Sequence, residues 1–583
     1  MTKITDYISG LEIASKPEEI DAVQPFSKQL VEDYNYPKDQ IQTRPQFRVK
    51  ANPSDTKKSF PVDIVVFSSK EKNEKEAYII VECKKKNRKD GRSQLENYLS
   101  FSNAYLGVWF NGKERIFIQK YFEDDKLKFR EIPNIPLFGQ RVEDIGKFKR
   151  KDLKPTNNLI PTFKSIRNFL AANTVGVTRD EVFAQQLINV IFCKIYDERF
   201  TPLESEVRFR CGVNEDPEDV SKRIKNIFED VKRKYREVFN QSDNIELDPK
   251  SLVYIVGEMQ IYSLIDAERD VVGDAFETFI GSALKGAQGQ FFTPRNLVKM
   301  MIEILDPSID DLIIDPACGS GGFITETLRY IWKKLDADAE KYGWNEANLN
   351  EEKLEVAIER IRGIDKDYFL SKVSKAYMAI LGDGKGGIFT DNSLENPSNW
   401  DSKTKAKVNL GTYSILLANP PFGSKIKIDG KDLLSQYELG HEWKKDKITN
   451  KYQKGKIKNK ETPQIIFIER CIQLLQEEGK MGIVLPDGVF GNDHFEYVRE
   501  FLIKNGKILA VIDVPIETFQ PKTSTKTSIL FFQKLRPEKI PDDYKIFMAS
   551  LETCGHDRRG NIIDSDDISQ VSAKYKEWLE NAG

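Results

Sequence analysis

The chain has 583 residues, of which 39% are hydrophobic and 31% are charged, and such a length predicts about two to four domains. No apolar run is long enough to span a membrane, and residues 1–10 lack the basic-then-apolar pattern of a signal peptide. The six cysteines form no Cys-x-x-Cys pair, which excludes a disulfide scaffold and a cysteine zinc site. We therefore expect a cytoplasmic protein with reduced thiols and no membrane partner.

The formal net charge of -2 conceals two basic regions. Residues 1–150 carry 28 Lys and Arg against 23 Asp and Glu, and residues 424–460 carry 11 Lys against 5 acidic residues. Each of these two basic regions lies beside a motif that contains candidate catalytic residues. Because the chain has only three histidines, we expect any catalysis to depend on carboxylates, lysines and amide groups.

The first 150 residues mix helical and strand patterns. Alternating or continuous apolar runs predict strands at 61–67, 77–83, 106–110 and 115–121. Residues 150–160 are charged and contain proline, which is typical of a linker.

The rest of the chain changes its periodicity twice. Residues 160–285 repeat apolar side chains at helical spacing and predict a helical region. From residue 290 to 550, short apolar strands alternate with helical stretches, which predicts a mostly parallel, doubly wound sheet. After residue 552 the sequence is polar, with one short helix expected at its end.

A glycine-rich loop, DPACGSGGF at residues 315–323, follows one of these strands and precedes a helix. Glycines allow the backbone to turn tightly and to approach a ligand closely at the carboxyl edge of a parallel sheet. The loop is neither a Walker A motif nor the dinucleotide pattern G-x-G-x-x-G. Asp365, at the end of the next strand, is placed to accept hydrogen bonds from ribose hydroxyls. The glycine loop and Asp365 together fit an adenosyl ligand without a pyrophosphate. The simpler alternative is that the glycine loop is only a tight strand-to-helix turn.

A second loop, Asn419-Pro420-Pro421-Phe422, ends a later strand. The amine of a nucleic acid base is a poor nucleophile, and the side-chain oxygen of Asn419 with the carbonyl of Pro420 can hold its hydrogens. The two prolines fix the backbone, so both acceptors are positioned before the substrate arrives. Phe422 can stack on a base that has left the duplex. The alternative is a strand end closed by two prolines, with Phe422 in the core.

Five elements occur in the order GQFFTPR, DPACGSGGF, GIDKD, DNSL and ANPPFG, and this order resembles the amino-methyltransferases of type I restriction-modification systems. The arrangement is similar to the gamma order of that class, and the resemblance covers about residues 155–560. It implies a Rossmann-like class I methyltransferase domain at 286–555, dependent on S-adenosylmethionine, after a helical connector domain at 155–285. A polar tail would occupy 556–583.

The same resemblance implies which residues contact the cofactor S-adenosylmethionine, with Asp391 near its adenine ring. The implied set is Gln290, Phe291, Phe292, Thr293, Pro294, Arg295, Asp315, Pro316, Gly319, Ser320, Gly321, Gly322, Asp365 and Asp391. The resemblance further implies that Asn419, Pro420, Pro421 and Phe422 form the catalytic loop.

The substrate class depends on a further segment, because the same tetrapeptide also serves in protein glutamine methyltransferases. The basic insertion at 424–460 interleaves Tyr437, Trp443 and Tyr452 with its lysines. Lysines meet phosphates and aromatic rings can stack on bases, so the insertion favours double-stranded DNA. A solvated, disordered lysine loop is the alternative.

The N-terminal region contains a separate group of charged residues. Asp63 lies on one predicted strand, and Glu82 and Lys84 at the end of the next face the same side because they are two residues apart. Two carboxylates can hold Mg²⁺ with waters, and a lysine can polarise the attacking water or the scissile phosphate. A solvated hairpin is the alternative explanation of the same residues.

This pattern resembles the PD-(D/E)xK nuclease core, and within it the N-terminal nuclease domain of type I restriction subunits. Gln94 and Tyr98 match the Q-x-x-x-Y element of that family, and Glu32 is a weaker match to an upstream acid. The resemblance implies a nuclease-like α/β domain at 1–150 in which Asp63 and Glu82 hold Mg²⁺. Lys84 and Gln94 would complete its catalytic set, although such domains can persist without cleaving.

The sequence as a whole predicts an α/β multidomain restriction-modification enzyme that methylates the N6 amine of adenine and cleaves unmethylated DNA. It contains no ATPase motif and no segment large enough for target recognition after residue 550, so we expect a separate specificity subunit; a homo-oligomer is also compatible with the sequence. The alternatives are an inert nuclease domain, a protein glutamine methyltransferase, a DNA-binding protein without catalysis, and the front part of a longer enzyme.

Overall fold

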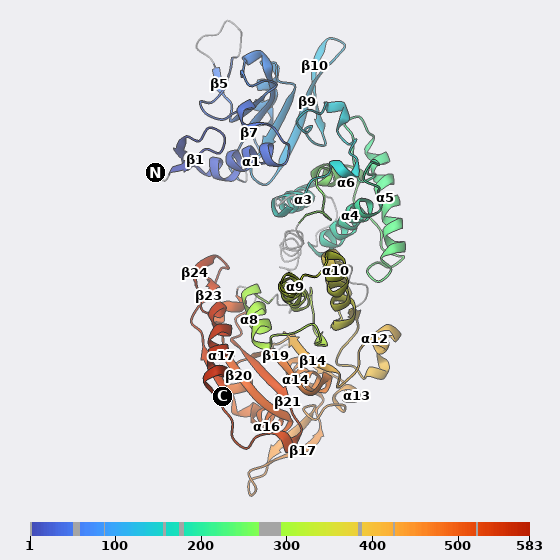
Figure 1. Ribbon diagram of the computed structural model, residues 1–583, viewed down its shortest axis with the longest axis vertical. Coiled ribbons are helices and arrows are strands. Elements are labelled where there is room, and N and C mark those ends of the chain that lie inside the picture. The colour runs from blue at the N-terminus through green and yellow to red at the C-terminus, as the bar shows by residue number, and fades with distance from the viewer. Residues whose placement is uncertain are drawn as a thin grey trace. The chain divides into compact units, whose positions relative to one another are not determined.

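The structure is a computed structural model that describes residues 3–50, 59–86, 88–155, 159–173, 180–267, 293–382, 387–423, 426–520 and 523–582. The chain forms two compact units (Figure 1). Unit 1 contains Met1–Arg236 and Asn240–Ala283, and unit 2 contains Glu237–Phe239 and Leu284–Gly583. All six cysteines are free, as predicted, and all are buried. None of the described helices has the length and apolar character of a membrane span.

Unit 1 begins with a six-stranded sheet in the order β10-β9-β8-β7-β6-β3, in which only β7 and β8 are parallel. Its strands are β3 (Ile41–Gln42), β6 (Ile64–Phe67), β7 (Ala77–Cys83), β8 (Leu106–Phe110), β9 (Arg115–Glu123) and β10 (Lys126–Ile132). Two small hairpins accompany it, β1 (Lys3–Thr5) with β2 (Glu12–Ala14), and β4 (Arg48–Lys50) with β5 (Ser59–Pro61). The strands predicted at 77–83, 106–110 and 115–121 are confirmed. Of the strand predicted at 61–67, Pro61 ends β5 and only Ile64–Phe67 form β6.

The sheet is covered on both faces, which explains the continuous apolar runs of its central strands. Ile79 and Val81 of β7 pack in the same cluster as helix α1 (Gln24–Glu32). Ile80, which points to the opposite face, packs in the cluster that contains helix α2 (Arg92–Ser100).

Helices form the second part of unit 1, as predicted, over the described residues. They are α3 (Leu159–Asn173), α4 (Asp180–Phe200), α5 (Pro217–Lys234) and α6 (Pro249–Met259). The side chains of Asp216 and Asp248 cap α5 and α6 by accepting hydrogen bonds from backbone N–H groups, and each is followed by a proline at the first helical position. The sequence therefore encodes both helix starts locally.

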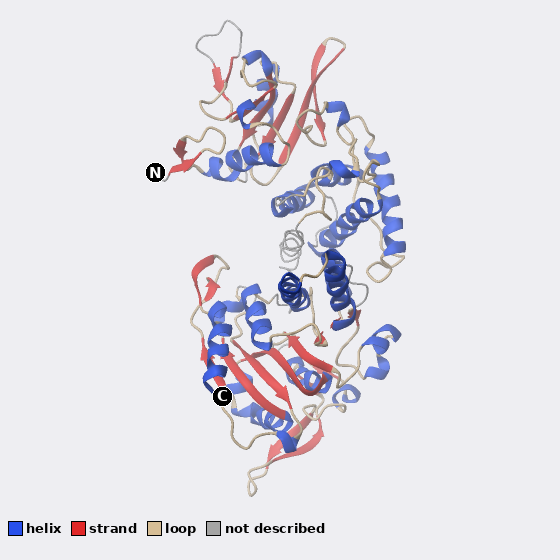
Figure 2. Cartoon of the chain, viewed as in Figure 1, coloured by secondary structure: helices blue, strands red, loops and turns tan. Residues whose placement is uncertain are grey.

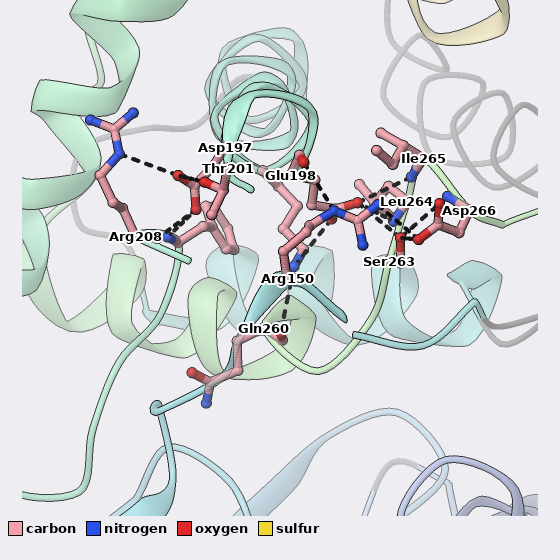
Figure 3. A network of polar contacts seen from close by, with 12 residues as sticks. Arg150, Asp197, Glu198, Thr201, Arg208, Gln260, Ser263, Leu264, Ile265 and Asp266 are labelled. Atoms are coloured by element: carbon pink, nitrogen blue, oxygen red, sulfur yellow. Dashed lines mark hydrogen bonds and ion pairs between the residues drawn. The ribbon is translucent and has the colours of Figure 1, made fainter. Parts of the chain in front are cut away.

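The predicted linker at 150–160 is wrong for the residues that the structure describes there. Arg150 is 4% exposed, its Nε donates to the Glu198 carbonyl at 2.9 Å, and its guanidinium pairs with Asp266 at 2.8 Å (Figure 3). The carboxylate of Glu198 in turn accepts from the Leu264 backbone N–H at 2.9 Å. Arg150 is buried here because the helical region supplies its partners, and residues 1–150 and the helices belong to one compact unit. Residues 156–158 lie outside the described residues.

Unit 2 is built on an eight-stranded sheet in the order β13-β12-β11-β14-β19-β21-β20-β22 (Figure 2). Its strands are β11 (Ile313–Asp315), β12 (Ile361–Asp365), β13 (Ile388–Thr390), β14 (Tyr413–Ala418), β19 (Leu475–Pro486), β20 (Gly506–Asp513), β21 (Thr527–Lys534) and β22 (Phe547–Ser550). All neighbouring pairs are parallel except those that β21 makes with β19 and β20.

Both faces of this sheet carry helices, which confirms the predicted doubly wound fold. The helices are α8 (Arg295–Leu305), α9 (Gly322–Tyr342), α10 (Glu346–Glu355), α11 (Tyr368–Gly382), α12 (Ser402–Lys407), α13 (Lys431–Leu434), α14 (Pro463–Leu474), α15 (Gly488–Gly491), α16 (Glu496–Asn505) and α17 (Ile568–Ala582). Met481 and Ile483 of β19 share a cluster with α14 and α16. A Cβ on Gly482, between them, would meet Met301 of α8 on the opposite face at 3.2 Å.

The polar tail predicted at 556–583 is instead an integral part of unit 2. A hairpin of β23 (Cys554–His556) and β24 (Ile562–Asp566) leads into α17, which packs on α8. Asn296 of α8 donates to the Cys554 carbonyl at 3.0 Å, and Ile568 is fully buried. The helix is mostly polar because only one of its faces is covered.

Candidate active sites

The chain changes direction across the sheet of unit 2 between β11 and β14. From β11 it proceeds outward to β12 and β13, and it then returns to the other side of β11 as β14. Ligands of open α/β sheets bind at such a switch point, beyond the carboxyl ends of the strands. A cavity of about 570 Å³ lies here, and five predicted residues line it: Pro316, Gly319, Asp365, Asn419 and Pro421.

The glycine loop and Asp365 form one wall of this cavity. The Asp365 carboxylate accepts from the backbone N–H groups of Gly319 at 2.9 Å and Asp367 at 2.8 Å, and burial raises its pKa. Gly321 has a φ of +89°, and a Cβ there would meet Ser374 Oγ at 2.9 Å. Cβ atoms on Gly319 and Gly322 would meet no described atom within 4 Å, so the backbone there is open to a ligand.

Asp315, at the end of β11, is buried behind this loop. Burial raises its pKa to about 8, although its carboxylate accepts from the Ala317 backbone N–H at 3.0 Å. The folded protein therefore keeps a proton that the unfolded chain releases near pH 4.

We expect this proton to make stability depend on pH. Between about pH 4 and pH 8 the unfolded chain alone ionises Asp315, so stability falls by up to about 1.4 kcal/mol per pH unit. Asp315→Asn cannot ionise, and its gain over the wild type should grow from pH 5 to pH 8 in thermal or urea unfolding. A difference that stays constant with pH would contradict this assignment.

The side chain of Asn419 connects the two halves of the site. Its Nδ2 donates to Thr293 Oγ1 at 3.0 Å, which leaves the Asn419 Oδ1 buried with no hydrogen bond from any residue that the structure describes. A buried acceptor without a partner costs about 1–3 kcal/mol. Because Asn419 also lines the cavity, a ligand could supply the missing donor.

Phe422 does not present an open face. It is 2% exposed and lies edge-on to Phe519, with ring centroids 6.2 Å apart. A base could stack on Phe422 only after Phe519 or another neighbour moves, and the structure thus shows the core position that the simpler alternative describes. Pro420 is also buried, while Pro421 lines the cavity.

Several other residues of the predicted cofactor set lie outside the cavity lining. Arg295 pairs with Glu326 of α9 at 2.8 Å. Asp391 accepts from the backbone N–H of Asp401 at 2.7 Å, so its carboxylate organises the segment after β13. Thr293, Pro294, Ser320, Gly321 and Gly322 are also absent from the lining, and Gln290, Phe291 and Phe292 fall outside the described residues.

Sequence reasoning missed part of the lining. Asn392, Ser393 and Leu394 face the cavity where Asp391 was expected. Their signal was present, because they follow β13 in the DNSL segment and the carboxyl ends of parallel strands meet at one edge. Leu433 and Phe467 also line the cavity, and no local pattern marks them.

The basic insertion is folded over residues 426–460, so the disordered alternative is wrong there. It contains β15 (Ile428–Asp429), β16 (His441–Lys445), β17 (Tyr452–Ile457) and β18 (Lys460–Glu461), with β15 paired to β18 and β16 to β17. Its aromatic residues support the fold rather than offer stacking faces. Tyr437 is 1% exposed, with its OH donating to the Leu394 carbonyl at 2.6 Å, and Trp443 and Tyr452 pack on Tyr497.

The N-terminal group of charged residues gathers at one end of the unit 1 sheet. Asp63 occupies the bend just before β6 rather than the strand itself, and its carboxylate accepts from the Cys83 backbone N–H at 2.8 Å. Lys84 Nζ contacts the Glu82 carboxylate, so both project to the same side as predicted. Burial raises the pKa of Asp63 to about 6 and that of Glu82 to about 7, with the charge of Asp63 adding to the Glu82 shift.

Helix α2 brings the Q-x-x-x-Y element to the same place. Lys84 Nζ donates to Gln94 Oε1 at 3.2 Å, Gln94 donates to Tyr98, and the Tyr98 OH donates to the Pro61 carbonyl at 3.3 Å. Gly91, just before the helix, has a φ of +111°, and a Cβ there would meet Lys84 Cε at 2.7 Å. A side chain at Gly91, just before the helix, would therefore clash with Lys84.

Two other acidic residues, rather than the predicted upstream acid Glu32, act electrostatically on Asp63. Glu32 is paired with Lys28 at 3.8 Å and is half exposed, whereas the charges of Glu18 and Glu19 act on Asp63 and raise its pKa. The acidic pair at the start of the helical segment was the available signal. Among the described residues no group of three His, Cys, Asp or Glu side chains converges at metal distance. The charge of Asp63 nevertheless raises the pKa of the neighbouring Glu82, and a divalent cation bound between the two carboxylates would relieve this repulsion.

Comparisons with known proteins agree with this division of the chain. The family model "N-6 DNA Methylase" matches residues 267–583, and the model "Type I restriction enzyme R protein N terminus (HSDR_N)" matches residues 17–136. The Type I restriction enzyme EcoEI methylase subunit of Escherichia coli is 25% identical over 313 residues, which are 53% of this chain and 55% of that protein. The Type II restriction enzyme and methyltransferase RM.BcgI of Heyndrickxia coagulans is 22% identical over 54% of this chain and 42% of that protein.

The chain thus spans about half the length of the curated relatives it matches. A solved chain from work on complex assembly and conformational transition of the type I R-M system is 17% identical, with a TM-score of 0.51. It covers 73% of this chain and 84% of its own length. That likeness bears on the fold, and the predicted class I fold of S-adenosylmethionine-dependent methyltransferases is confirmed. Because the first family model covers more than half of the chain, the protein belongs to the N-6 DNA methylase family.

Proposed function

We propose that unit 2 transfers a methyl group from S-adenosylmethionine to the N6 amine of adenine in double-stranded DNA. The observation that carries this proposal is the buried, unpartnered Oδ1 of Asn419 on the cavity at the switch point. An acceptor in that position suits a substrate that brings its own N–H donors, and the exocyclic amine of adenine is such a donor.

The residues of the cavity have distinct roles in this proposal. Gly319, Gly322 and Asp365 would hold the nucleoside part of S-adenosylmethionine, because the two glycines leave open space and Asp365 orders the loop. When bound, S-adenosylmethionine supplies an electrophilic methyl group on a sulfonium. Asn419 Oδ1 and the Pro420 carbonyl would accept the amine hydrogens and orient the nitrogen lone pair, while Thr293 fixes the rotation of the Asn419 amide.

Family membership and the lysines of the insertion favour DNA over a protein glutamine as the substrate. The EcoEI relative is named as a methylase subunit of a type I restriction enzyme. By analogy with it, we propose that a separate specificity subunit supplies the target sequence.

The direct test uses the full chain with labelled S-adenosylmethionine and duplex DNA, with and without the products of neighbouring genes. We expect label at N6 of adenine, identified by nucleoside mass spectrometry. Label on protein glutamine would favour the other substrate class. A chain that does not bind S-adenosylmethionine at all would favour a binding protein without catalysis.

We propose a second activity, Mg²⁺-dependent cleavage of unmethylated DNA, for the N-terminal part of unit 1. Its support is the convergence of Asp63, Glu82, Lys84 and Gln94, together with the match to the type I restriction enzyme R protein N terminus. Asp63 and Glu82 would hold the metal ion. Lys84 would polarise a phosphate oxygen or the attacking water, with Gln94 and Tyr98 orienting its ammonium group.

Asp63→Ala should abolish this cleavage because it removes one of two metal-holding carboxylates. The measurement is nicking of unmethylated plasmid with Mg²⁺ and with EDTA, in the presence of the same neighbouring gene products. Glu32→Ala is the matched control, since Glu32 pairs with Lys28 rather than with Asp63, Glu82 or Lys84, and should leave cleavage unchanged. If the wild-type complex methylates DNA but never cleaves it, the domain is inert.

A further inference from the structure

A lysine-rich hairpin of β16 and β17 extends from residues beside the candidate methyltransferase cavity. Ile457, at the end of β17, packs against a cluster that contains Leu394 and Phe467, and both of these line the cavity. Figure 1 shows β17 at the lower end of unit 2, with the turn beside it protruding beyond the sheet. Five residue steps along β17 span roughly 17 Å at about 3.3 Å each, a length comparable to about five base pairs of a duplex.

The stem of the hairpin is anchored on one side only. Trp443 and Tyr452 pack on Tyr497 of α16, and Lys445 pairs with Glu496 at 2.6 Å. Unit 2 therefore holds the hairpin in a fixed direction and leaves its turn in solvent.

The turn is built to display one apolar side chain. The Asp446 carboxylate accepts from the backbone N–H groups of Ile448 at 3.0 Å and Thr449 at 2.8 Å, and the Asp446 N–H donates to the Lys451 carbonyl at 2.9 Å. These bonds fix the turn, and Ile448 projects from it with 95% of its surface exposed. An isoleucine that stays exposed to water contributes no hydrophobic stabilisation to the folded chain.

The lysines of the hairpin divide into two kinds. Lys456 pairs with Glu442 at 3.6 Å, and Lys460 in the adjacent β18 pairs with Asp429 at 3.2 Å. Four exposed lysines make no ion pair with any residue in the described ranges: Lys444, Lys447, Lys451 and Lys454. Unneutralised cations around a protruding turn are complementary to a phosphate backbone.

We propose that the β16–β17 hairpin binds the target duplex beside the methyltransferase cavity, with these four lysines on phosphates and Ile448 against an unstacked base step. The inference rests on the proposed DNA methylation and deepens it. Extracting an adenine disrupts the stack, and an apolar wedge inserted at a base step stabilises a duplex that is distorted in this way. The lysines set the affinity for any duplex, and the isoleucine acts where the stack is opened.

The test measures binding of the full chain to a fluorescent duplex by anisotropy over a salt series. Lys447→Ala with Lys451→Ala should lower the slope of log K against log salt by about two, because each lost phosphate contact removes close to one counterion. Lys456→Ala with Lys460→Ala is the matched control. It removes the same charge from paired lysines and should change the slope by less than half as much.

Ile448→Ser should act differently from the lysine variants. Loss of an apolar contact should weaken binding on the order of tenfold while the salt slope stays at the wild-type value. All these side chains are exposed, so thermal unfolding should be unchanged.

The outcomes separate the hairpin from the proposed function. If the wild type methylates and binds DNA, but the lysine variants keep its slope and Ile448→Ser keeps its affinity, only the hairpin assignment is overturned. If the wild type neither methylates nor binds DNA, even with the products of neighbouring genes present, the proposed function fails, and the hairpin assignment fails with it.

Discussion

Replacing Asn419 with alanine should slow methyl transfer to DNA on the order of 10²- to 10³-fold, the effect typical of removing one positioned polar group from a reacting centre. The substitution removes the buried Oδ1, which accepts no hydrogen bond from the described residues. Binding of S-adenosylmethionine should change little, because the glycine loop and Asp365 form a separate wall of the cavity. Single-turnover transfer and isothermal titration measure the two quantities separately.

Thr293→Val extends this test, because its hydroxyl accepts from Asn419 Nδ2 at 3.0 Å. Without that bond the Asn419 amide can rotate and present its NH₂ group to the amine. We expect a smaller loss of kcat than in Asn419→Ala, with recovery in Thr293→Ser. In the Asn419→Ala background, Thr293→Val should cost little more, since both act on the same bond. Additive losses would show that Thr293 acts through the cofactor instead.

Breaking the buried ion pair between Arg115 and Glu258 should have the largest effect on stability. Arg115 lies on β9 and Glu258 on α6, and their side chains are 4% and 1% exposed. The Arg115 Nε donates to Glu258 Oε1 at 2.6 Å, and its Nη1 donates to Gln29 at 2.9 Å. Glu258→Ala leaves the guanidinium buried without its carboxylate, which should cost about 3–5 kcal/mol in urea unfolding.

Two further variants serve as controls for the loss of stability in Glu258→Ala. Glu123→Ala breaks an exposed pair with Lys128 on the same sheet and should cost less than about 1 kcal/mol. Arg115→Met with Glu258→Met replaces the pair with apolar side chains and should recover much of the loss. Because the pair joins the sheet to the helices of unit 1, both should unfold in one transition. Two separate transitions would restore the domain boundary predicted near residue 150.

The sequence by itself determined the local elements. The bounds of β7 and β8, the helical region and the alternating strands of unit 2 follow from apolar periodicity, because each strand or helix must bury a continuous face. It also identified the loops at the carboxyl ends of β11 and β14, since such loops in parallel sheets need glycine and proline at defined places.

Only the tertiary structure decided which side chains meet. Thr293 reaches Asn419 across 126 positions of the chain, and Glu18, rather than Glu32, acts on Asp63. Burial of Arg150 and Tyr437 was equally invisible, because a charged or aromatic side chain in a polar segment has the same local pattern whether or not a distant partner covers it. Polar groups take their partners from long-range packing, and the periodicity of a sequence records only which face is apolar.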